Sequence, residues 1–304
     1  MSDGENILDL LDQLKNMPEE ITLQKIRHFS ISLEIFDNNY ADLVHHLKIH
    51  NDSKTCFELM AVKNREMLHT YQREITRFLH NYIASALSLT DHARNHYDDL
   101  YGNNDLFPDY QNEIDSRFTK NPLAVFVKNL RHYFQHYRIP GVQSSLVVKN
   151  NISAEMKLLL TLQELNLYTG WKAPAKEFIS AQKTDIDVID LVNKYHDLIT
   201  DFYRWYMTRT HSIHKNDIEV VKAHRNKIRG LEVSILLRKF AARPKTGEEF
   251  EEEMNRLFHD DDLEKIKKST SPAVKIANIL DLLRKTKPLQ KEEIETITKL
   301  FPIK

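Results

Sequence analysis

The chain has 304 residues, of which 41% are hydrophobic and 29% are charged, and its formal net charge is −1. These values are ordinary for a soluble globular protein. Cys56 is the single cysteine, which excludes an internal disulfide, and no apolar run reaches the roughly 18 residues of a membrane span. We therefore expect a cytoplasmic protein with no membrane segment.

Six glycines and nine prolines are few for this length, which favours helices over short strands and turns. We expect a mainly α fold: a helical bundle with a small β-hairpin insertion and a helical C-terminal extension. The expected domains are N-terminal helices over residues 1–52, a helical core over 53–243 and a charged helical extension over 244–304.

The first half of the chain shows helical spacing almost throughout. A helix over residues 5–16 ends before Pro18, and one or two helices follow as far as position 50. Residues 53–100 contain neither glycine nor proline and predict one very long helix, or two with a break. A short helix is expected near residues 109–118.

The helix expected at residues 121–139 is the best defined. Asn121 is a good N-cap, Pro122 suits the first helical position, and Pro140 disfavours helical geometry just before it. Apolar residues recur at three- and four-residue steps and predict a buried face. They are Leu123, Phe126, Val127, Leu130, Tyr133, Phe134 and Tyr137.

A change of pattern follows this helix. Residues 142–161 alternate and are rich in β-branched residues, with Lys149, Asn150 and Asn151 between the two halves, so we expect a two-stranded hairpin. A short helix over 162–168 comes next, closed by Gly170.

Further helices complete the prediction. Pro174 opens one, Asp185 caps a long one that reaches about residue 210, and another covers 217–242. Charged helices are expected after Gly247.

Residues 116–154 contain no aspartate or glutamate, although the chain as a whole has 44 acidic residues. The segment carries several basic residues, and the 121–139 helix lies inside it. One interpretation is a local anion-binding face, and the other is a solvated basic surface. The basic residues are Arg117, Lys120, Lys128, Arg131, Arg138 and Lys149.

Within that helix, Arg131 and His136 are separated by four residues, and His132 directly follows the arginine. This motif resembles the hallmark of the HEPN superfamily (higher eukaryotes and prokaryotes nucleotide-binding), many of whose members are metal-independent RNA-cutting toxins, antiviral factors or RNA-processing enzymes. The resemblance covers at most residues 60–210. It implies a helical bundle, RNA as the substrate, no cofactor or metal, and two motif helices facing each other in a homodimer. The sequence leaves open whether an antitoxin or another regulatory protein controls it.

Geometry favours such a shared site. Arg131 and His136 lie about 140° apart around a regular helix, so they converge only if the last turn unwinds or if a second copy packs across a dyad. Arg131 would then bind the phosphate and His136 would transfer a proton, with His132 or Asn129 orienting the RNA. Lys128, Arg138, Asp91 and Arg94 are further candidates for substrate binding.

Alternatives stay open beside this hypothesis. The protein could be a non-catalytic helical module that binds nucleotide, RNA or a protein partner. Two groups on helix faces have ligand-like spacing for a metal ion, and the aromatic residues at 202–206 fit either packing or base stacking. The two groups are Asp42, His46 and His50, and His211, His214 and Asp217.

Overall fold

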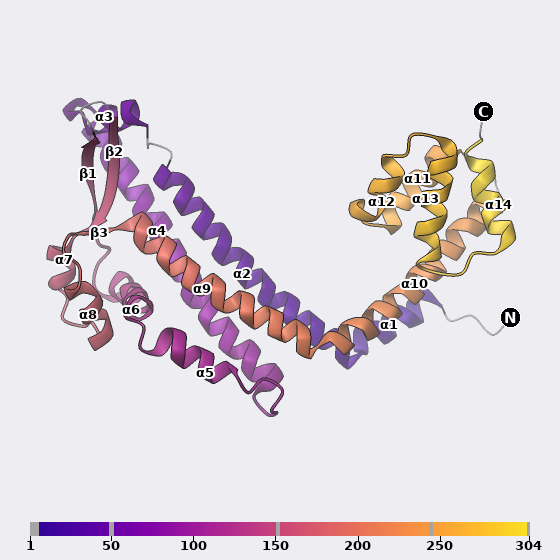
Figure 1. Cartoon of the computed structure of the whole chain (residues 1–304), viewed down its shortest axis with the longest axis horizontal. Coiled ribbons are helices and arrows are strands. Elements are labelled where there is room, and N and C mark those ends of the chain that lie inside the picture. The colour runs from indigo at the N-terminus through magenta and orange to yellow at the C-terminus, as the bar shows by residue number, and fades with distance from the viewer. Residues whose placement is uncertain (1–5, 49–51, 150–152, 243–245, 303–304) are drawn as a thin grey trace. The chain divides into compact units, whose positions relative to one another are not determined.

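The computed structural model describes residues 6–48, 52–149, 153–242 and 246–302. Within this part the protein is mainly α-helical, with one small antiparallel sheet (Figure 1). Contacts divide the chain into a larger unit, residues 25–213, and a smaller unit made of the residues before 25 and from 214 onward. These boundaries lie at residues 24–25 and 213–214, whereas the expected ones lie near 52 and 243.

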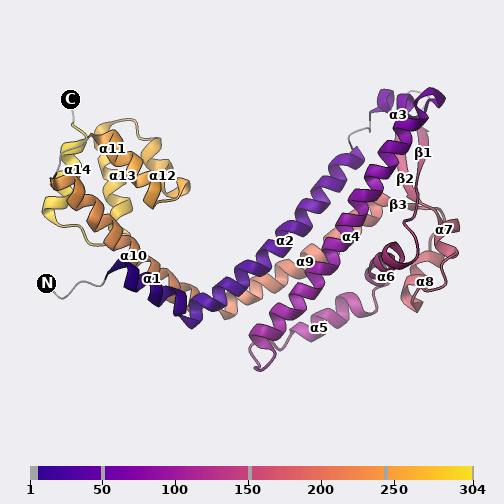
Figure 2. The same ribbon diagram turned by 180° about the vertical axis from the view of Figure 1, so that it is seen from behind.

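Three long helices form the centre of the larger unit. They are α2 (Pro18–Lys48) from residue 25 onward, α4 (Arg65–Tyr101) and α9 (Val188–Ile213), and they lie side by side in two opposite views (Figures 1 and 2). Aromatic rings fill the space between them: Tyr82 of α4 lies 5.3 Å from Phe36 of α2, measured between ring centroids. The side chains that follow the predicted apolar spacing in these segments thus form the core of the unit.

The segment 53–100 forms two helices with a break. Asp52 caps α3 (Ser53–Met60) by accepting a hydrogen bond from the Thr55 amide, and the chain turns extended at Ala61. A single 3₁₀ turn, η1 (Val62–Asn64), then leads into α4. Of the two alternatives for this segment, the broken helix is confirmed.

The predicted hairpin is confirmed. β1 (Val142–Lys149) pairs antiparallel with β2 (Ser153–Leu160), and Leu146 faces Met156 in the register. On β2 every second side chain is buried, as expected for a strand with one face on the core. The predicted turn at Asn150 and Asn151 lies outside the described residues.

A third strand was not predicted. β3 (Ile186–Asp187) is two residues long and pairs with the end of β2, too short to leave a pattern in the sequence. Asp185 was wrongly predicted to cap α9: its carboxylate accepts the Leu162 amide instead, at 2.9 Å. The cap is supplied by Asp187, which accepts the Ile189 amide, and α9 begins at Val188.

The helix α6 (Pro122–His136) has the predicted start. The Asn121 side chain accepts hydrogen bonds from the Leu123 and Ala124 amides. It ends three residues before the expected position 139, because the amides of Tyr137 and Arg138 both donate to the Tyr133 carbonyl and close the helix. Short helices surround α6: α5 (Tyr110–Ile114), the π-helical turn η2 (Asp115–Thr119), α7 (Leu162–Asn166) and α8 (Ala173–Ser180).

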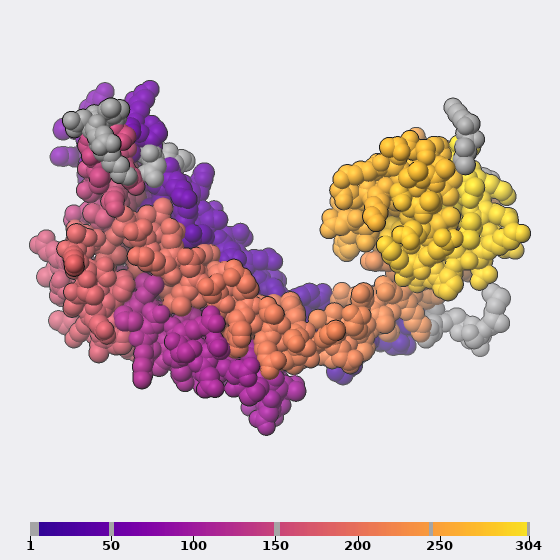
Figure 3. Space-filling model, viewed as in Figure 1, coloured from indigo at the N-terminus to yellow at the C-terminus, as the bar shows by residue number. Residues whose placement is uncertain are grey.

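The smaller unit has its own core. α1 (Ile7–Asn16) packs on α10 (Lys215–Ala242), where His224 hydrogen-bonds the Leu10 carbonyl. Four helices surround the far part of α10 and form the rounded yellow-orange body in Figure 3. They are α11 (Gly247–Leu257), α12 (Asp260–Lys267), α13 (Pro272–Arg284) and α14 (Lys291–Leu300).

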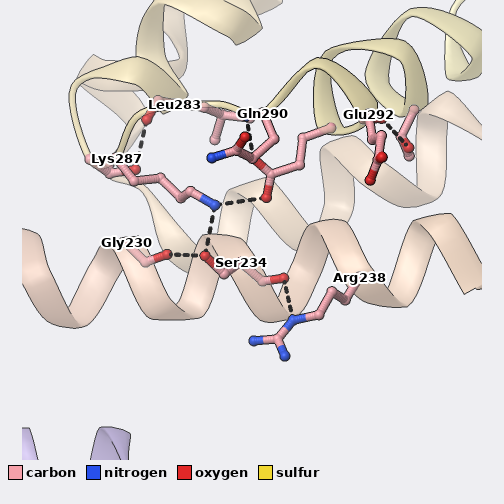
Figure 4. A network of polar contacts seen from close by, with 10 residues as sticks. Gly230, Ser234, Arg238, Leu283, Lys287, Gln290 and Glu292 are labelled. Carbon is pink, nitrogen blue, oxygen red and sulfur yellow. Dashed lines mark hydrogen bonds and ion pairs between the residues drawn. The ribbon is translucent and has the colours of Figure 1, made fainter. Parts of the chain in front are cut away.

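A polar network fixes the connection between α13 and α14 to α10 (Figure 4). Lys287 donates to the Ser234 hydroxyl at 2.9 Å and to Glu293 at 2.7 Å, and Glu293 accepts the Gln290 amide in a capping box. The connection crosses α10 at Gly230, where an added Cβ would lie 3.0 Å from the Thr286 carbonyl oxygen. Glycine therefore allows this close approach.

None of the helices in the described ranges combines the length and the apolar character needed to cross a bilayer.

Candidate functional site at the end of helix α6

Helix α6 divides the predicted site residues between its two sides. Its buried face carries most of the predicted apolar residues, with Phe126, Leu130 and Tyr133 essentially inaccessible. Tyr137 was wrongly predicted to lie on this face: it follows the last helical residue and is 44% exposed. Lys128, His132 and His136 follow each other at four-residue steps and are all exposed. Residues at this spacing share one face of a helix, so they form a single basic row.

The two histidines of this row are in contact. The centroids of the His132 and His136 rings lie 4.5 Å apart, and Nδ1 of His132 is 3.1 Å from the Tyr168 hydroxyl. Tyr168 is itself held edge-on against Trp171 and Tyr133. The imidazole pair is thus exposed to solvent but supported from below by packed aromatic rings.

Arg138 brings a cation to the same end of α6. Its guanidinium carbon lies 5.0 Å from the centroid of the Tyr137 ring, which is 5.1 Å from Tyr168. The chain leaving α6 is anchored by Glu164, whose carboxylate accepts the Gly141 amide at 3.2 Å. Tyr133 beneath the histidines has a raised pKa, chiefly through burial and secondly through the charge of Glu164.

Arg131 lies on the other border of the buried face. Phe134, one turn further along, contacts His80 of α4, so this side of α6 points toward α4. Arg131 is half-buried, and its Nε is sealed from solvent without a hydrogen-bond partner among the described residues. Because α6 stays helical through His136, unwinding does not bring the two residues together within one chain.

Asn129 is committed to the fold. It is buried, its side-chain nitrogen donates to the Val125 carbonyl, and its side-chain oxygen accepts the Lys172 amide, each at 3.0 Å. The second of these bonds joins α6 to the start of α8. Both halves of the amide are occupied, so Asn129 serves as a tie between two helices.

Asp91 and Arg94 form a separate pair on α4. They bind each other at 2.5 Å, and both side chains are more than half exposed. A pair with this exposure is a surface ion pair of small energetic value. Among the described residues, no hydrogen bond or ion pair connects it to α6.

Two site residues were missed by the sequence analysis. Tyr168 was assigned to the end of a short helix, and Lys172 was not considered. Both come from the segment between α7 and α8, and only tertiary packing brings that segment to α6. A tyrosine and a lysine on either side of a glycine give no local signal of this placement.

The structure also bears on the aromatic group at residues 202–206 and on the two groups with metal-ligand spacing. Phe202, Tyr203 and Tyr206 are buried and pack in the core, whereas Trp205 of the same group is partly buried. In the described ranges no three His, Cys, Asp or Glu side chains are placed to hold a metal ion. His50, one of the candidate ligands, lies outside those ranges.

Comparison of the chain with models of protein families, with curated proteins and with solved structures gives no match.

Proposed function

We propose that the protein is a metal-independent endoribonuclease that acts as a homodimer in the cytoplasm, in a toxin or antiviral defence setting controlled by a regulatory protein. The observation that carries the proposal is the exposed His132–His136 pair, held by Tyr168 and accompanied by Arg138 in a segment without acids. The resemblance of the Arg131–His136 motif to the HEPN superfamily supplies the reaction class.

The chemistry needs few groups because RNA carries its own nucleophile. The 2′-OH attacks the adjacent phosphate, a base removes its proton, and an acid protonates the departing 5′ oxygen, leaving a 2′,3′-cyclic phosphate and a 5′-OH. Histidine can perform either proton step near neutral pH. An arginine neutralises the charge that develops on the phosphate oxygens.

The arrangement of the rings supports particular roles within this scheme. In an in-line displacement the attacking and leaving oxygens lie on opposite sides of phosphorus. His132 and His136 are side by side, so together they serve one of these sides: His136 transfers the proton and His132 orients it. The proton-transfer group on the opposite side of phosphorus would come from the second copy, and so would the arginine that binds the phosphate. Arg131 would bind it through its terminal guanidinium nitrogens, because its Nε is buried.

Apolar exposure beside His136 supports a second copy. Tyr137 is 44% exposed and Ile139 is 62% exposed, directly after the helix that carries the histidines. Large apolar side chains grouped at one surface commonly mark a protein interface. A dimer formed here would bring two motif helices together and cover both side chains.

The test is cleavage of a single-stranded RNA in EDTA. We expect a cyclic phosphate product, with activity reduced by about 10²-fold or more in His136→Gln and in Arg131→Gln. His28→Gln on α2, which removes another exposed histidine, is the matched control and should cleave like the parent. Circular dichroism confirms that each variant is folded.

Two results would contradict the proposal. Cleavage that requires an added divalent ion would exclude the metal-independent mechanism, and full activity in His136→Gln would exclude the site. RNA binding that weakens steeply with salt, without cleavage, would favour the second candidate, a non-catalytic RNA-binding module. The separation of Arg131 from His136 within one chain is the observation that favours this second candidate.

A further inference from the structure

A second site lies beside Lys128, the first residue of the basic row of α6. A cavity of about 450 Å³ opens between α4, the π-helical turn η2, α6, the start of α8 and α9. Its volume falls within the roughly 300–1,000 Å³ typical of small-molecule sites. We propose that it binds an amphipathic organic anion, with an apolar body inside and a single acidic head group at two lysines.

The interior of the cavity is apolar and fixed in shape. Phe118, Phe202 and Tyr203 line it together with Leu87 and Ile199, and several of these side chains are held in the core of the larger unit. Apolar walls that face an open cavity lose the dispersion contacts that neighbouring atoms would supply. An apolar ligand body would restore those contacts.

Three polar side chains of the wall are already bonded within the protein. Thr90 donates to the Ala86 carbonyl, Thr119 donates to the Asp115 carboxylate, and both halves of the Asn129 amide are occupied. A nucleobase needs partners for its own donors and acceptors. The wall offers few, which favours an aliphatic or simple aromatic body over a base.

Two lysines define the charge of the ligand. Lys128 and Lys172 both line the cavity and are both exposed, and none of the lining residues is acidic. The hydrogen bond between Asn129 and the Lys172 amide holds the two lysine-bearing segments together. Two ammonium groups without a carboxylate in the wall suit a carboxylate, sulfonate or phosphate head.

Part of the backbone that forms the cavity wall has an unusual helical geometry. The turn η2 (Asp115–Thr119) has π-helical geometry and contributes Phe118 and Thr119 to the wall. Single π-helical turns occur frequently at functional sites. Here the wider turn carries an aromatic ring to the wall of the cavity.

The experiment is calorimetric titration of the full chain with decanoate, with decanol as the uncharged probe of the same length. We expect one decanoate per chain and binding of decanol weaker by about tenfold or more. The double variant Lys128→Gln/Lys172→Gln should lose about tenfold in decanoate affinity and leave decanol unchanged. Lys176→Gln, one turn along α8 and outside the cavity wall, is the matched control and should bind like the parent.

Two further variants test the location. Ala124→Phe fills the cavity from α6 and should abolish binding of both probes. Because this variant could disturb the fold, Thr119→Trp covers the cavity from an exposed position and should have the same effect.

Three results would overturn the proposal: decanoate binding unchanged in the double lysine variant, unchanged in Thr119→Trp, or displaced by adenosine monophosphate. The last would identify the occupant as a nucleotide. RNA cleavage is a separate readout that uses His136, so failure of either proposal leaves the other standing.

Discussion

The two units of the chain have different interiors. The larger unit is built from stacked rings, such as Tyr40 and His196 with centroids 3.6 Å apart, and its buried polar atoms include Tyr133 Oη and Thr210 Oγ1 without a hydrogen-bond partner. In the described residues of the smaller unit no buried side-chain polar atom is left without one. There the core is mostly aliphatic, and capping boxes stabilise the first turns of α11 and α14.

This difference indicates where function should be sought. Folding alone favours satisfied polar groups and filled cores, and departures from that rule concentrate at working sites. The histidine pair, the half-buried Arg131 and the lysine-rimmed cavity all lie in the larger unit.

The largest predicted effect tests the aromatic core. Tyr82 is 1% exposed and packs against Phe36 and Tyr195, so Tyr82→Ala should lower the free energy of unfolding of the larger unit by about 3–5 kcal/mol. Hydrogen exchange measured by mass spectrometry should show lost protection in α4 and α9 but not in α13. Ile235→Ala, at an exposed position, is the control. Equal loss of protection in α13 would contradict a separate stability of the two units.

The second prediction tests the satisfied polar network of the smaller unit. Lys287 and Glu293 are 19% and 18% exposed, so Lys287→Met leaves a poorly solvated carboxylate and should cost about 1–3 kcal/mol. Lys285→Met breaks the Asp281 pair, which is 66% and 68% exposed, and should cost about 0–1 kcal/mol. Chemical denaturation that finds equal costs would show that the Lys287 network adds nothing beyond a surface pair.

The third prediction separates structure from catalysis at α6. Asn129→Ala removes the tie to α8 and should cost about 1–3 kcal/mol, since buried partners are left unsatisfied. RNA cleavage per folded molecule should be unchanged. Asn81→Ala, exposed on α4, is the stability control. A selective loss of cleavage at full stability would instead make Asn129 a substrate-binding residue.

The smallest predicted effects distinguish the units by pH. Burial lowers the pKa of His196 below its ordinary 6.5, against the opposing charges of Asp37 and Asp197. As the pH falls, His196 therefore takes up a proton in the unfolded chain before it does so in the folded protein. The larger unit should lose stability as the pH falls below 6.5. His196→Phe should remove that part of the pH dependence, as measured by denaturation between pH 7 and pH 5, roughly the window in which histidine titrates.

The smaller unit should respond only at lower pH. Burial acts to raise the pKa of Glu293, but hydrogen bonds from Lys287 and the Gln290 amide outweigh it and leave the pKa below the ordinary 4.5. Its stabilisation is present above 4.5 and is lost as the pH falls through the lowered value. If the smaller unit instead weakens at the same pH as the larger one, His196 and Glu293 are not the groups responsible.

Much of the fold could be predicted because its signals are local. The Asn121 cap, the apolar spacing of α6 and the alternation of the hairpin each depend on a few neighbouring residues. The end of α6 was misplaced by three residues because a shared carbonyl, that of Tyr133, closes it before Pro140 acts. β3 exists only because β2 lies beside it.

The candidate site was predicted less completely, for a physical reason. Helical spacing places His132 and His136 on one face, but it gives neither the hydroxyl of Tyr168 nor the backbone of Lys172, which arrive through the α7–α8 segment. The same spacing could not show that Asn129 is already bonded. Contacts between distant segments decide which polar residues stay available for a ligand.

Gly230 has a consequence for engineering. Replacing a glycine inside a helix by alanine usually stabilises a protein by about 0.5–1 kcal/mol. At this crossing the new methyl group would press on the Thr286 carbonyl at 3.0 Å, so the usual gain should be cancelled or reversed. A thermostability library built on glycine-to-alanine exchange should therefore skip position 230.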